Sequence, residues 1–328
     1  MPSPRGGRPS LRAVITALAG GVGAAKFLAG LVRAVPPESV TAIVNVADDD
    51  TFHGLHVSPD LDSVTYALAG VNNAALGWGR ADESFRTIDE LDRFGSDTWF
   101  RLGDLDLATH LYRTEQLRAG RPLSAVTVAI AEGFGIRTRL LPVTDDRVAT
   151  RITAADPAGP AGATREFAMQ EWFVRERCEP AVVAVHFDGA DAARPAPGVL
   201  EALHTAETIV LCPSNPVISI GPLLAVRGIR DILAARRDHV VAISPIVGGA
   251  PVKGPADRLM GPLGIEVSCV GVAREYAALC GTLVVDAVDR HRAGEVESAG
   301  LRCIVADTMM HSPEIAAALA RTTLAAVA

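Results

Sequence analysis

The chain has 328 residues, of which 49% are hydrophobic and 21% are charged, and its formal net charge at pH 7 is −7. This composition is typical of a globular protein with a substantial core, and it excludes a disordered chain. The acidic balance provides no basic face for sequence-independent binding to DNA or RNA, so we expect no nucleic-acid partner.

The N-terminal residues 1–10 are interpreted as a disordered tail, the alternative being the start of a signal peptide. The apolar pattern that follows continues into a stretch with Lys26 and Arg33, which argues against a secretory signal. No apolar run is long enough to cross a bilayer, so we expect no membrane partner. The five cysteines show no C-x-x-C spacing and are interpreted as buried thiols of a cytoplasmic protein.

In chain order, the first predicted elements are a strand at about 12–18, a glycine turn at 20–23 and a helix at 24–34. The segment SVTAIVNV follows as a second buried strand, which completes a βαβ unit. An acidic loop then leads into another helix. Residues 83–135 predict three helices that each end at a glycine, and residues 137–176 predict a β-hairpin.

Beyond residue 180 the pattern of alternating strands and helices returns. The candidate strands are AVVAVHF, TIVLCPS, HVVAISPI, GTLVVDA and RCIVADT, and a helix ends the chain. This alternation predicts an α/β fold, namely a doubly wound, mainly parallel, Rossmann-like sheet. We expect a nucleotide-binding core of residues 11–80 and 180–328, with an α+β insertion of helices and a hairpin at 81–179.

Ligands of such sheets bind at the carboxyl ends of the strands, and the first of these ends carries Gly20, Gly21 and Gly23. The loop differs from the dinucleotide fingerprint because Lys26 stands where a small residue is needed. It also lacks the second glycine and the hydroxyl of a P-loop. Glycine N–H groups at a helix start still suit a phosphate, with Lys26 on the first turns. The alternative is a tight packing turn.

Five carboxylates lie within fifteen residues after the second strand, which is more than a ribose hydroxyl requires. Carboxylates this close repel one another unless a cation joins them, and Mg²⁺ binds carboxylates together with phosphate oxygens. We interpret the group as a Mg²⁺–diphosphate site, the alternative being a solvated loop with Asp62 as a helix cap. His53 and His56 are assigned ordinary polar roles. The five residues are Asp48, Asp49, Asp50, Asp60 and Asp62.

Two further strand ends carry polar loops. Ser214 and Asn215 stand between prolines in CPSNPVISIGP, where hydroxyl, amide and N–H groups suit a phosphate or a base edge. Lys253 lies between glycine clusters, which suits an anion, although this segment alone predicts only a loop. No G-x-S-x-G elbow and no cysteine with an obvious partner is present, so covalent catalysis is not supported.

Several segments taken together carry a resemblance to a known family. They are LAGGVGAAKFLAGL, VNVADDDTFHGLHVSPDLDSVTYALAG, GWGRADESF, LGDLDLATHLYRTEQLRAG, LLPVTDDRV, CPSNPVISIGPLLAV and SPIVGGAPVKGPADRLM. In this combination and order the chain resembles the 2-phospho-L-lactate transferases of deazaflavin coenzyme F-420 biosynthesis, the CofD family. The resemblance extends over nearly the whole chain and is closest to actinobacterial members.

The resemblance implies a Mg²⁺-dependent transferase that moves a phospho-organic acid from a guanosine diphospho-acid donor. The acceptor would be the ribityl hydroxyl of the deazaflavin 7,8-didemethyl-8-hydroxy-5-deazariboflavin, and GMP would be released. The transferred acid is 2-phospho-L-lactate in some members and phosphoenolpyruvate in others, and the sequence leaves this choice open. The resemblance also implies a homodimer, and it implies that the insertion forms part of the acceptor site.

On this basis the candidate residues receive roles. The metal is assigned to Asp48, Asp49, Asp60 and Asp62, and catalysis to Asp49, Asp60 and Asp62. Donor phosphate and nucleotide are assigned to Gly20, Gly21, Gly23, Lys26, Ser214, Asn215 and Lys253. The acceptor is assigned to Trp78, His110, Arg113 and Asp145, with Trp172 as a further candidate. For Trp78 and Trp172 the alternative is burial in the core, and for Asp145 it is a cap of the hairpin.

Two other functions remain as alternatives. An NAD(P)-dependent oxidoreductase would need no Mg²⁺, and Lys26 argues against it because that position of the fingerprint needs a small residue. A non-catalytic nucleotide-binding regulator would bind a nucleotide tightly without turnover.

Overall fold

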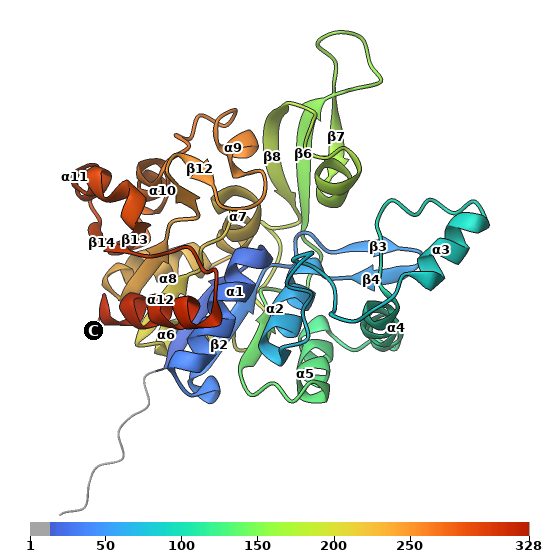
Figure 1. The fold of residues 1–328 in the computed structure, drawn as a ribbon, viewed down its shortest axis with the longest axis horizontal. Coiled ribbons are helices and arrows are strands. Elements are labelled where there is room, and N and C mark those ends of the chain that lie inside the picture. The colour runs from blue at the N-terminus through green and yellow to red at the C-terminus, as the bar shows by residue number, and fades with distance from the viewer. Residues whose placement is uncertain (1–13, 328) are drawn as a thin grey trace, which may run out of the picture.

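A seven-stranded sheet forms the centre of the protein in the computed structural model, which describes residues 14–327 (Figure 1). The predicted tail at residues 1–10 lies outside the described residues. The strand order is β14-β13-β10-β9-β1-β2-β5, and every neighbouring pair is parallel. The strands are β1 Ile15–Ala19, β2 Val40–Val44, β5 Arg139–Pro142, β9 Thr208–Leu211, β10 Val240–Ile243, β13 Thr282–Asp286 and β14 Arg302–Ala306.

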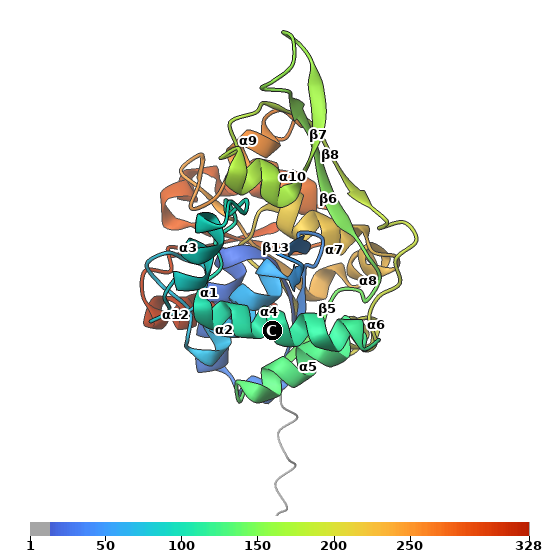
Figure 2. The same cartoon turned by 90° about the vertical axis from the view of Figure 1, so that its right-hand side faces the viewer.

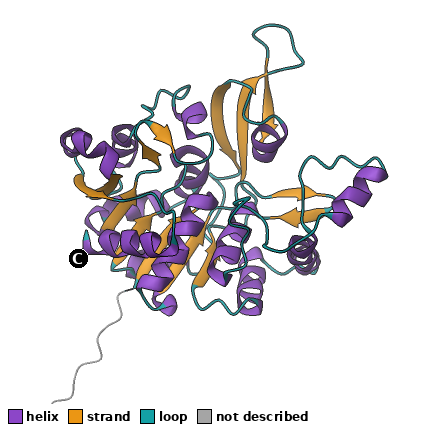
Figure 3. Ribbon diagram, in the orientation of Figure 1, coloured by secondary structure: helices purple, strands orange, loops and turns teal. Residues whose placement is uncertain are grey.

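Helices cover both faces of this sheet, so its central strands are short apolar runs buried on both sides (Figure 3). The helices α1 (Gly21–Ala34), α2 (Pro59–Ala69) and α12 (Pro313–Ala325) cover one face, whereas α6 (Val199–Thr205), α7 (Gly221–Ala225) and α8 (Ile229–Ala235) cover the other (Figure 2). α1 and α12 pack closely because Gly30 has no side chain. A Cβ at that position would lie only 2.6 Å from the Cβ of Ala316. The predicted doubly wound α/β sheet is therefore confirmed.

The predicted insertion at 81–179 does not form one unit, because its residues 139–142 are the edge strand β5 of the central sheet. The helix α5 (Leu123–Gly133) leads directly into this strand as a crossover helix. The helices α3 (Arg86–Arg93) and α4 (Asp104–Arg118) lie to one side with the hairpin of β3 (Asp50–Phe52) and β4 (Leu55–Val57) (Figure 1). Three helices were predicted in this region, and three are present.

A second, three-stranded antiparallel sheet in the order β7-β6-β8 projects from the core (Figure 1). Its strands are β6 (Ala149–Ala155), β7 (Thr164–Ala168) and β8 (Val182–Asp188), so the predicted hairpin is confirmed. The assignment of AVVAVHF to the central sheet is wrong, since this segment is β8. Only Val182 of β8 is buried, and Val183 is 57% exposed, so its apolar run does not mark a core strand.

The remaining elements are short. They are η1 Pro37–Ser39, η2 Glu171–Arg175, η3 Pro216–Ile220, η4 Arg237–His239, β11 Ile246–Val247, β12 Ala250–Pro251, α9 Ala256–Met260, α10 Cys269–Tyr276, η5 Ala287–Arg292 and α11 Ala293–Ser298. All five cysteines are free thiols, and four of them are buried. Within residues 14–327 none of the helices combines the length and the apolar character that a bilayer crossing requires.

Candidate active site

The loops after β1 and β9 meet at the point where the winding of the sheet reverses. From β1 the chain proceeds through β2 to β5 on one side, and β9, β10, β13 and β14 follow on the other. A crevice at such a switch point is where ligands of doubly wound sheets bind. The two loops touch directly, because Ser214 Oγ donates a hydrogen bond of 2.5 Å to the carbonyl oxygen of Gly20.

The glycines of the first loop allow this close contact. A Cβ on Gly23 would lie 2.0 Å from the carbonyl oxygen of Pro213, and a Cβ on Gly20 would lie 2.9 Å from Ser219 Cβ. Gly21 has a φ of +71°, which favours glycine, and its N–H donates a hydrogen bond of 2.7 Å to Asp60 Oδ1. The N-terminus of α1 thus stabilises a carboxylate of the chain itself, and phosphate binding by these glycines stays a prediction.

Asp48 and Asp60 form a buried carboxylate pair beside this helix N-terminus. Asn45 Nδ2 donates to Asp60 Oδ2 over 2.9 Å, and Thr150 Oγ1 donates to Asp48 Oδ1 over 2.9 Å. Burial raises the pKa of Asp48 well above its usual range, and the neighbouring charge of Asp60 raises it further. Burial likewise raises the pKa of Asp60 to about 6, although hydrogen bonds from Asn45 and Gly21 act in the opposite direction. Two anions held this close favour a bound cation.

Asp49 completes the group and has a free oxygen. Its Oδ2 accepts a hydrogen bond of 2.6 Å from Ser58 Oγ and lies 3.0 Å from His56 Nε2. Its Oδ1 is buried and has no hydrogen-bond partner in the described part of the chain. Burial raises the pKa of Asp49, while the contacts with His56 and Ser58 lower it. A buried carboxylate oxygen without a donor fits a hard cation such as Mg²⁺.

Asp62 was predicted to join this group, but its carboxylate is engaged elsewhere. Both of its oxygens accept hydrogen bonds from the guanidinium of Arg113, and the contact from Nη1 to Oδ2 measures 3.1 Å. His110 Nδ1 lies 3.7 Å from the same carboxylate, and Asp106 contacts His110 Nε2 at 3.2 Å. Asp62 is therefore part of a buried ion-pair network between α2 and α4. Together with Asp106 and His110 it offers ligand atoms within 4.8 Å of one another, and its predicted roles in metal binding and catalysis stay predictions.

The same network accounts for two residues that were assigned to the acceptor. His110 and Arg113 are 0% and 2% exposed, and both point into the network rather than into a ligand cleft. Their predicted contact with an acceptor is not supported, because neither side chain is accessible from outside. The physical reason is their position on the face of α4 that packs against α2. A buried arginine needs an anionic partner, which Asp62 provides.

Two lysines from distant segments converge near the glycine loop. Lys26 lies on α1, and Lys253 follows β12. Partial burial lowers the pKa of Lys253, and the positive charge of Lys26 lowers it further. A Cβ on Gly77 would lie 2.1 Å from Lys253 Nζ and 3.9 Å from Val22 Cγ1, which places Lys253 near the first turn of α1. Lys253 Nζ also donates to the carbonyl oxygen of Leu76 at 3.4 Å. Such a pair of cations suits the negative charge of a diphosphate, as the sequence predicted for each lysine separately.

The loop after β9 offers one unused donor. Asn215 Oδ1 caps η3 by accepting hydrogen bonds from the N–H groups of Val217 (2.9 Å) and Ile218 (3.4 Å). Its amide nitrogen Nδ2 is buried and has no partner within residues 14–327. The hydroxyl of Ser214 is already bonded to Gly20. Of the two predicted ligand residues in this loop, Asn215 therefore has the free donor.

The aromatic and acidic candidates for the acceptor differ in their surroundings. Trp78 is 43% exposed and packs edge-on against Phe85. Trp172 is fully buried, and its indole N–H donates to the carbonyl oxygen of Pro180, so it belongs to the core. Asp145 accepts hydrogen bonds from Ser124 N (2.6 Å) and Ser124 Oγ (2.8 Å) at the start of α5. It caps that helix rather than the hairpin. Trp78 alone keeps an open face for a ligand.

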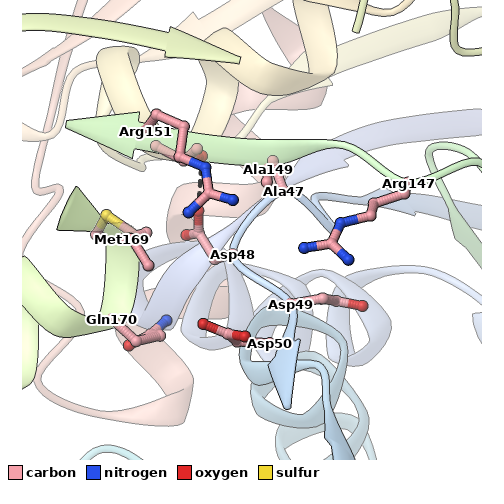
Figure 4. Close-up of a pocket in the computed structure, with 11 residues that line it drawn as sticks. Ala47, Asp48, Asp49, Asp50, Arg147, Ala149, Arg151, Met169 and Gln170 are labelled. Carbon is pink, nitrogen blue, oxygen red and sulfur yellow. Dashed lines mark hydrogen bonds between the residues drawn. The ribbon is translucent and has the colours of Figure 1, made fainter. Parts of the chain in front are cut away.

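A cleft lies between the aspartates and the three-stranded sheet, and sequence reasoning missed half of it. It is lined by residues 47–50, Arg147, residues 149–151 and residues 168–170. Figure 4 shows Asp48 and Asp50 on one side of the chain with Gln170 nearby, while Asp49 points to the other side. In Figure 4 the guanidinium group of Arg151 lies on the side of Asp48, and that of Arg147 lies on the side of Asp49. The one available signal was the basic pattern RVATR at the start of β6.

Comparison with known proteins identifies the family. Over residues 15–321 the chain matches the family model described as 2-phospho-L-lactate transferase CofD. The chain belongs to the CofD family. This confirms the resemblance found in the sequence and makes the chain a transferase.

Curated relatives of this CofD-family chain are similar over nearly their full length. Proteins named phosphoenolpyruvate transferase from Streptomyces griseus and Kitasatospora aureofaciens are both 46% identical to it. The alignments cover 94% and 95% of this chain and 97% of each relative. A protein of the same name from Mycolicibacterium smegmatis is 38% identical over 94% of this chain and 97% of its own.

The fold also matches a solved structure. The crystal structure of a UPF0052-family protein from Bacillus halodurans superposes on this CofD-family chain with a TM-score of 0.62 at 17% identity. The match covers 96% of this chain and 100% of that chain. At this identity the similarity supports the fold alone.

Proposed function

We propose that this chain transfers phosphoenolpyruvate from a guanosine diphospho-acid donor to the ribityl hydroxyl of a deazaflavin and releases GMP. The printed names of the relatives favour phosphoenolpyruvate over 2-phospho-L-lactate. The observation that carries the proposal is the site at the switch point, where a buried aspartate group with an unpartnered oxygen lies beside a helix N-terminus. A pair of lysines near the same loop adds the positive charge that a diphosphate needs.

The residues present fit a Mg²⁺ ion. Asp48, Asp49 and Asp60 offer hard oxygen ligands whose charges act on one another, and Oδ1 of Asp49 has no other partner in the described residues. These three side chains would hold the metal. When bound, Mg²⁺ offsets the charge of the diphosphate that the donor contributes.

Residues of the chain would bind the donor and accept the proton of the acceptor hydroxyl. Lys26, Lys253 and the amide of Asn215 would hold the donor phosphates, and the close loops around Gly20 and Gly23 would fix their position. The acceptor hydroxyl forms a bond to the phosphorus that carries the enolpyruvyl group. The bond from that phosphorus to the bridging oxygen breaks, and GMP leaves with the electron pair. A carboxylate oxygen of the aspartate group that is not bound to the metal accepts the hydroxyl proton.

The deazaflavin ring needs a flat apolar surface, and Trp78 offers one. Its indole is 43% exposed and stands beside Leu76, whose carbonyl oxygen contacts Lys253. A ring stacked there would lie next to the lysine pair, where the donor phosphates are proposed to bind. A homodimer and a cytoplasmic location stay predictions.

The proposal is tested by substituting the aspartate with the free oxygen. Asp49→Asn removes the negative charge while keeping a side chain of the same shape, and we expect at least a 100-fold loss of GMP release from the donor at saturating Mg²⁺. The matched control is Asp191→Asn, an exposed aspartate outside the site, which should retain full turnover. If Asp49→Asn keeps wild-type turnover and the same Mg²⁺ dependence, the proposed site is wrong.

A further inference from the structure

We propose that Arg151 on β6, Arg147 just before β6 and Gln170 just after β7 bind the carboxylate of the transferred three-carbon acid. This inference rests on the proposed function and assigns the part of the site that recognises the acid. In a 2-phospho acid, the phosphate ester and the carboxylate are attached to the same carbon. Wherever the reacting phosphorus is held, the carboxylate must therefore lie only a few bonds away.

The cleft beside the aspartates contains the groups that such a carboxylate needs. Arg147 and Arg151 line the same cleft as Asp48, Asp49 and Asp50, Arg151 on the side of Asp48 and Arg147 on the side of Asp49 (Figure 4). They are its only cationic lining residues among those the structure describes. A planar guanidinium can donate two parallel hydrogen bonds to a carboxylate, which suits arginine better than lysine for this task.

Arg147 is free to take a ligand. Within residues 14–327 it makes neither an ion pair nor a side-chain hydrogen bond, although it is exposed and stands close to three aspartates. Arg151, in contrast, is held by Asp188, whose Oδ2 lies 3.2 Å from its Nε. Arg151 is thus fixed on the sheet, and the guanidinium group of Arg147 keeps all of its donors for a bound anion.

Gln170 supplies an independent observation. The residue is 6% exposed, yet its side-chain amide makes no hydrogen bond among the described residues. Figure 4 shows this amide directed into the cleft beside Asp50. The amide atoms are not among the fully buried unpartnered atoms of the described residues, so they are accessible from the cleft, and an amide N–H is a suitable donor for a carboxylate oxygen.

Lys26 and Lys253 are less suited than the arginines to bind the carboxylate of the acid. Lys26 and Lys253 do not line the cleft, and Lys253 contacts the segment at Leu76. The lysine pair and the arginines therefore contact different parts of the donor. The lysines face the guanosine side of the diphosphate, and the arginines face the acid side, with the aspartates between them.

The test compares two donors in the full-length protein. One is the guanosine diphosphate ester of enolpyruvate, and the other is the same ester with hydrogen in place of the carboxylate. The variants are Arg147→Met and Gln170→Met, which lie on different segments. The control is Arg194→Met, since Arg194 has an 85% exposed side chain that contacts Asp146 and does not line the cleft.

We expect Arg147→Met to lower kcat/KM for the acid donor about 10- to 100-fold, mainly through KM, because a charge-assisted hydrogen bond is lost. The donor without a carboxylate should react equally well with this variant and with the wild type. Gln170→Met should show the same selectivity with a smaller loss, and Arg194→Met should show none. Arg147→Lys should recover part of the lost activity.

An equal loss for both donors would overturn the inference, because it would show a general or structural role for Arg147. Unchanged kinetics for both donors would also overturn it, and would place the carboxylate elsewhere, with the lysine pair as the next candidate. If the wild type releases no GMP from the acid donor, the proposed function itself is wrong, and the inference that rests on it is wrong too.

Discussion

At the scale of single residues, the site shows buried charge that the fold alone does not require. Asp48 and Asp60 are both buried, and each raises the electrostatic cost of the other. Removing one of these charges should raise the free energy of unfolding when no metal is bound. The proposed metal site therefore lowers the stability of the protein. Asp62 is different, since Arg113 neutralises it.

This difference leads to a first prediction about stability. Asp48→Asn removes a buried charge but keeps an oxygen that can accept the hydrogen bond from Thr150. We expect the variant without metal to gain about 1–2 kcal/mol in the free energy of unfolding and to lose most turnover. Urea unfolding in a chelator measures the first effect and GMP release the second. A less stable variant would show that the carboxylate supports the fold.

A second prediction concerns Gly23, where the two loops meet. A Cβ at this position would lie 2.0 Å from the carbonyl oxygen of Pro213, which is backbone and cannot move aside alone. We expect Gly23→Ala to cost about 1–3 kcal/mol of stability and to reduce activity by displacing the loop after β9. The control is Gly294→Ala in α11, where no atom lies within 4 Å and alanine should be neutral or stabilising. Equal stability of the two variants would contradict the tight contact.

At the scale of elements, α4 anchors the acidic loop from outside the central sheet. Arg113 binds Asp62 of α2, and Thr114 Oγ1 accepts a hydrogen bond of 2.8 Å from the N–H of His56. His56 in turn contacts Asp49, so α4 is linked to the aspartate group through the β4 strand. The helix thus positions the site without contributing a side chain to it.

A third prediction tests this anchoring. Arg113→Met leaves Asp62 as a buried charge without its partner, so we expect a loss of about 3–5 kcal/mol in the free energy of unfolding. Adding Asp62→Leu should recover a large part of the loss, because the unpaired charge is then removed as well. The control is Arg118→Met, an exposed arginine on the same helix. If the double variant is no more stable than Arg113→Met, the ion pair does not explain the burial of Arg113.

The elements also show how far the sequence could predict the fold. Its βαβ start and the alternating pattern after residue 200 predicted most of the central sheet correctly. The run LLPV and the run VVAV look equally apolar, yet the first is part of β5 in the core and the second of β8 in the outer sheet. The local hydrophobic pattern cannot distinguish the two runs, because the elements that pack against each strand in the folded protein decide which of its faces are buried.

The candidate site was predictable in part for a similar reason. Asp48, Asp49 and Asp60 were found because the carboxylates are dense in sequence and repel one another unless a cation joins them. Arg113 and His110 could not be recognised as partners of Asp62, since they lie about fifty residues away on another helix. Arg147 escaped notice because its only signal was the short basic pattern RVATR, and Gln170 because a single polar residue after β7 carries no spacing signal.

At the scale of the whole molecule, the doubly wound sheet gathers the site from segments that are far apart in the chain. Strand ends after β1, β2 and β9 contribute the glycine loop, the aspartates and Asn215, and the outer sheet adds the arginines. The central parallel sheet holds the first group, whereas residues on and beside the outer sheet line the cleft. This division suits an enzyme that must hold a donor firmly and admit a second substrate.

The central claim is the transfer of an enolpyruvyl phosphate to a deazaflavin, and one competition experiment tests it most directly. The protein is mixed with Mg²⁺, the deazaflavin and equal amounts of the enolpyruvyl and the lactyl guanosine diphosphate donors. The products are then identified by mass spectrometry. The account predicts GMP together with an adduct whose mass carries the enolpyruvyl phosphate, formed in clear excess over the lactyl adduct. Tight binding of guanine nucleotide without either adduct would contradict it and would favour a nucleotide-binding regulator.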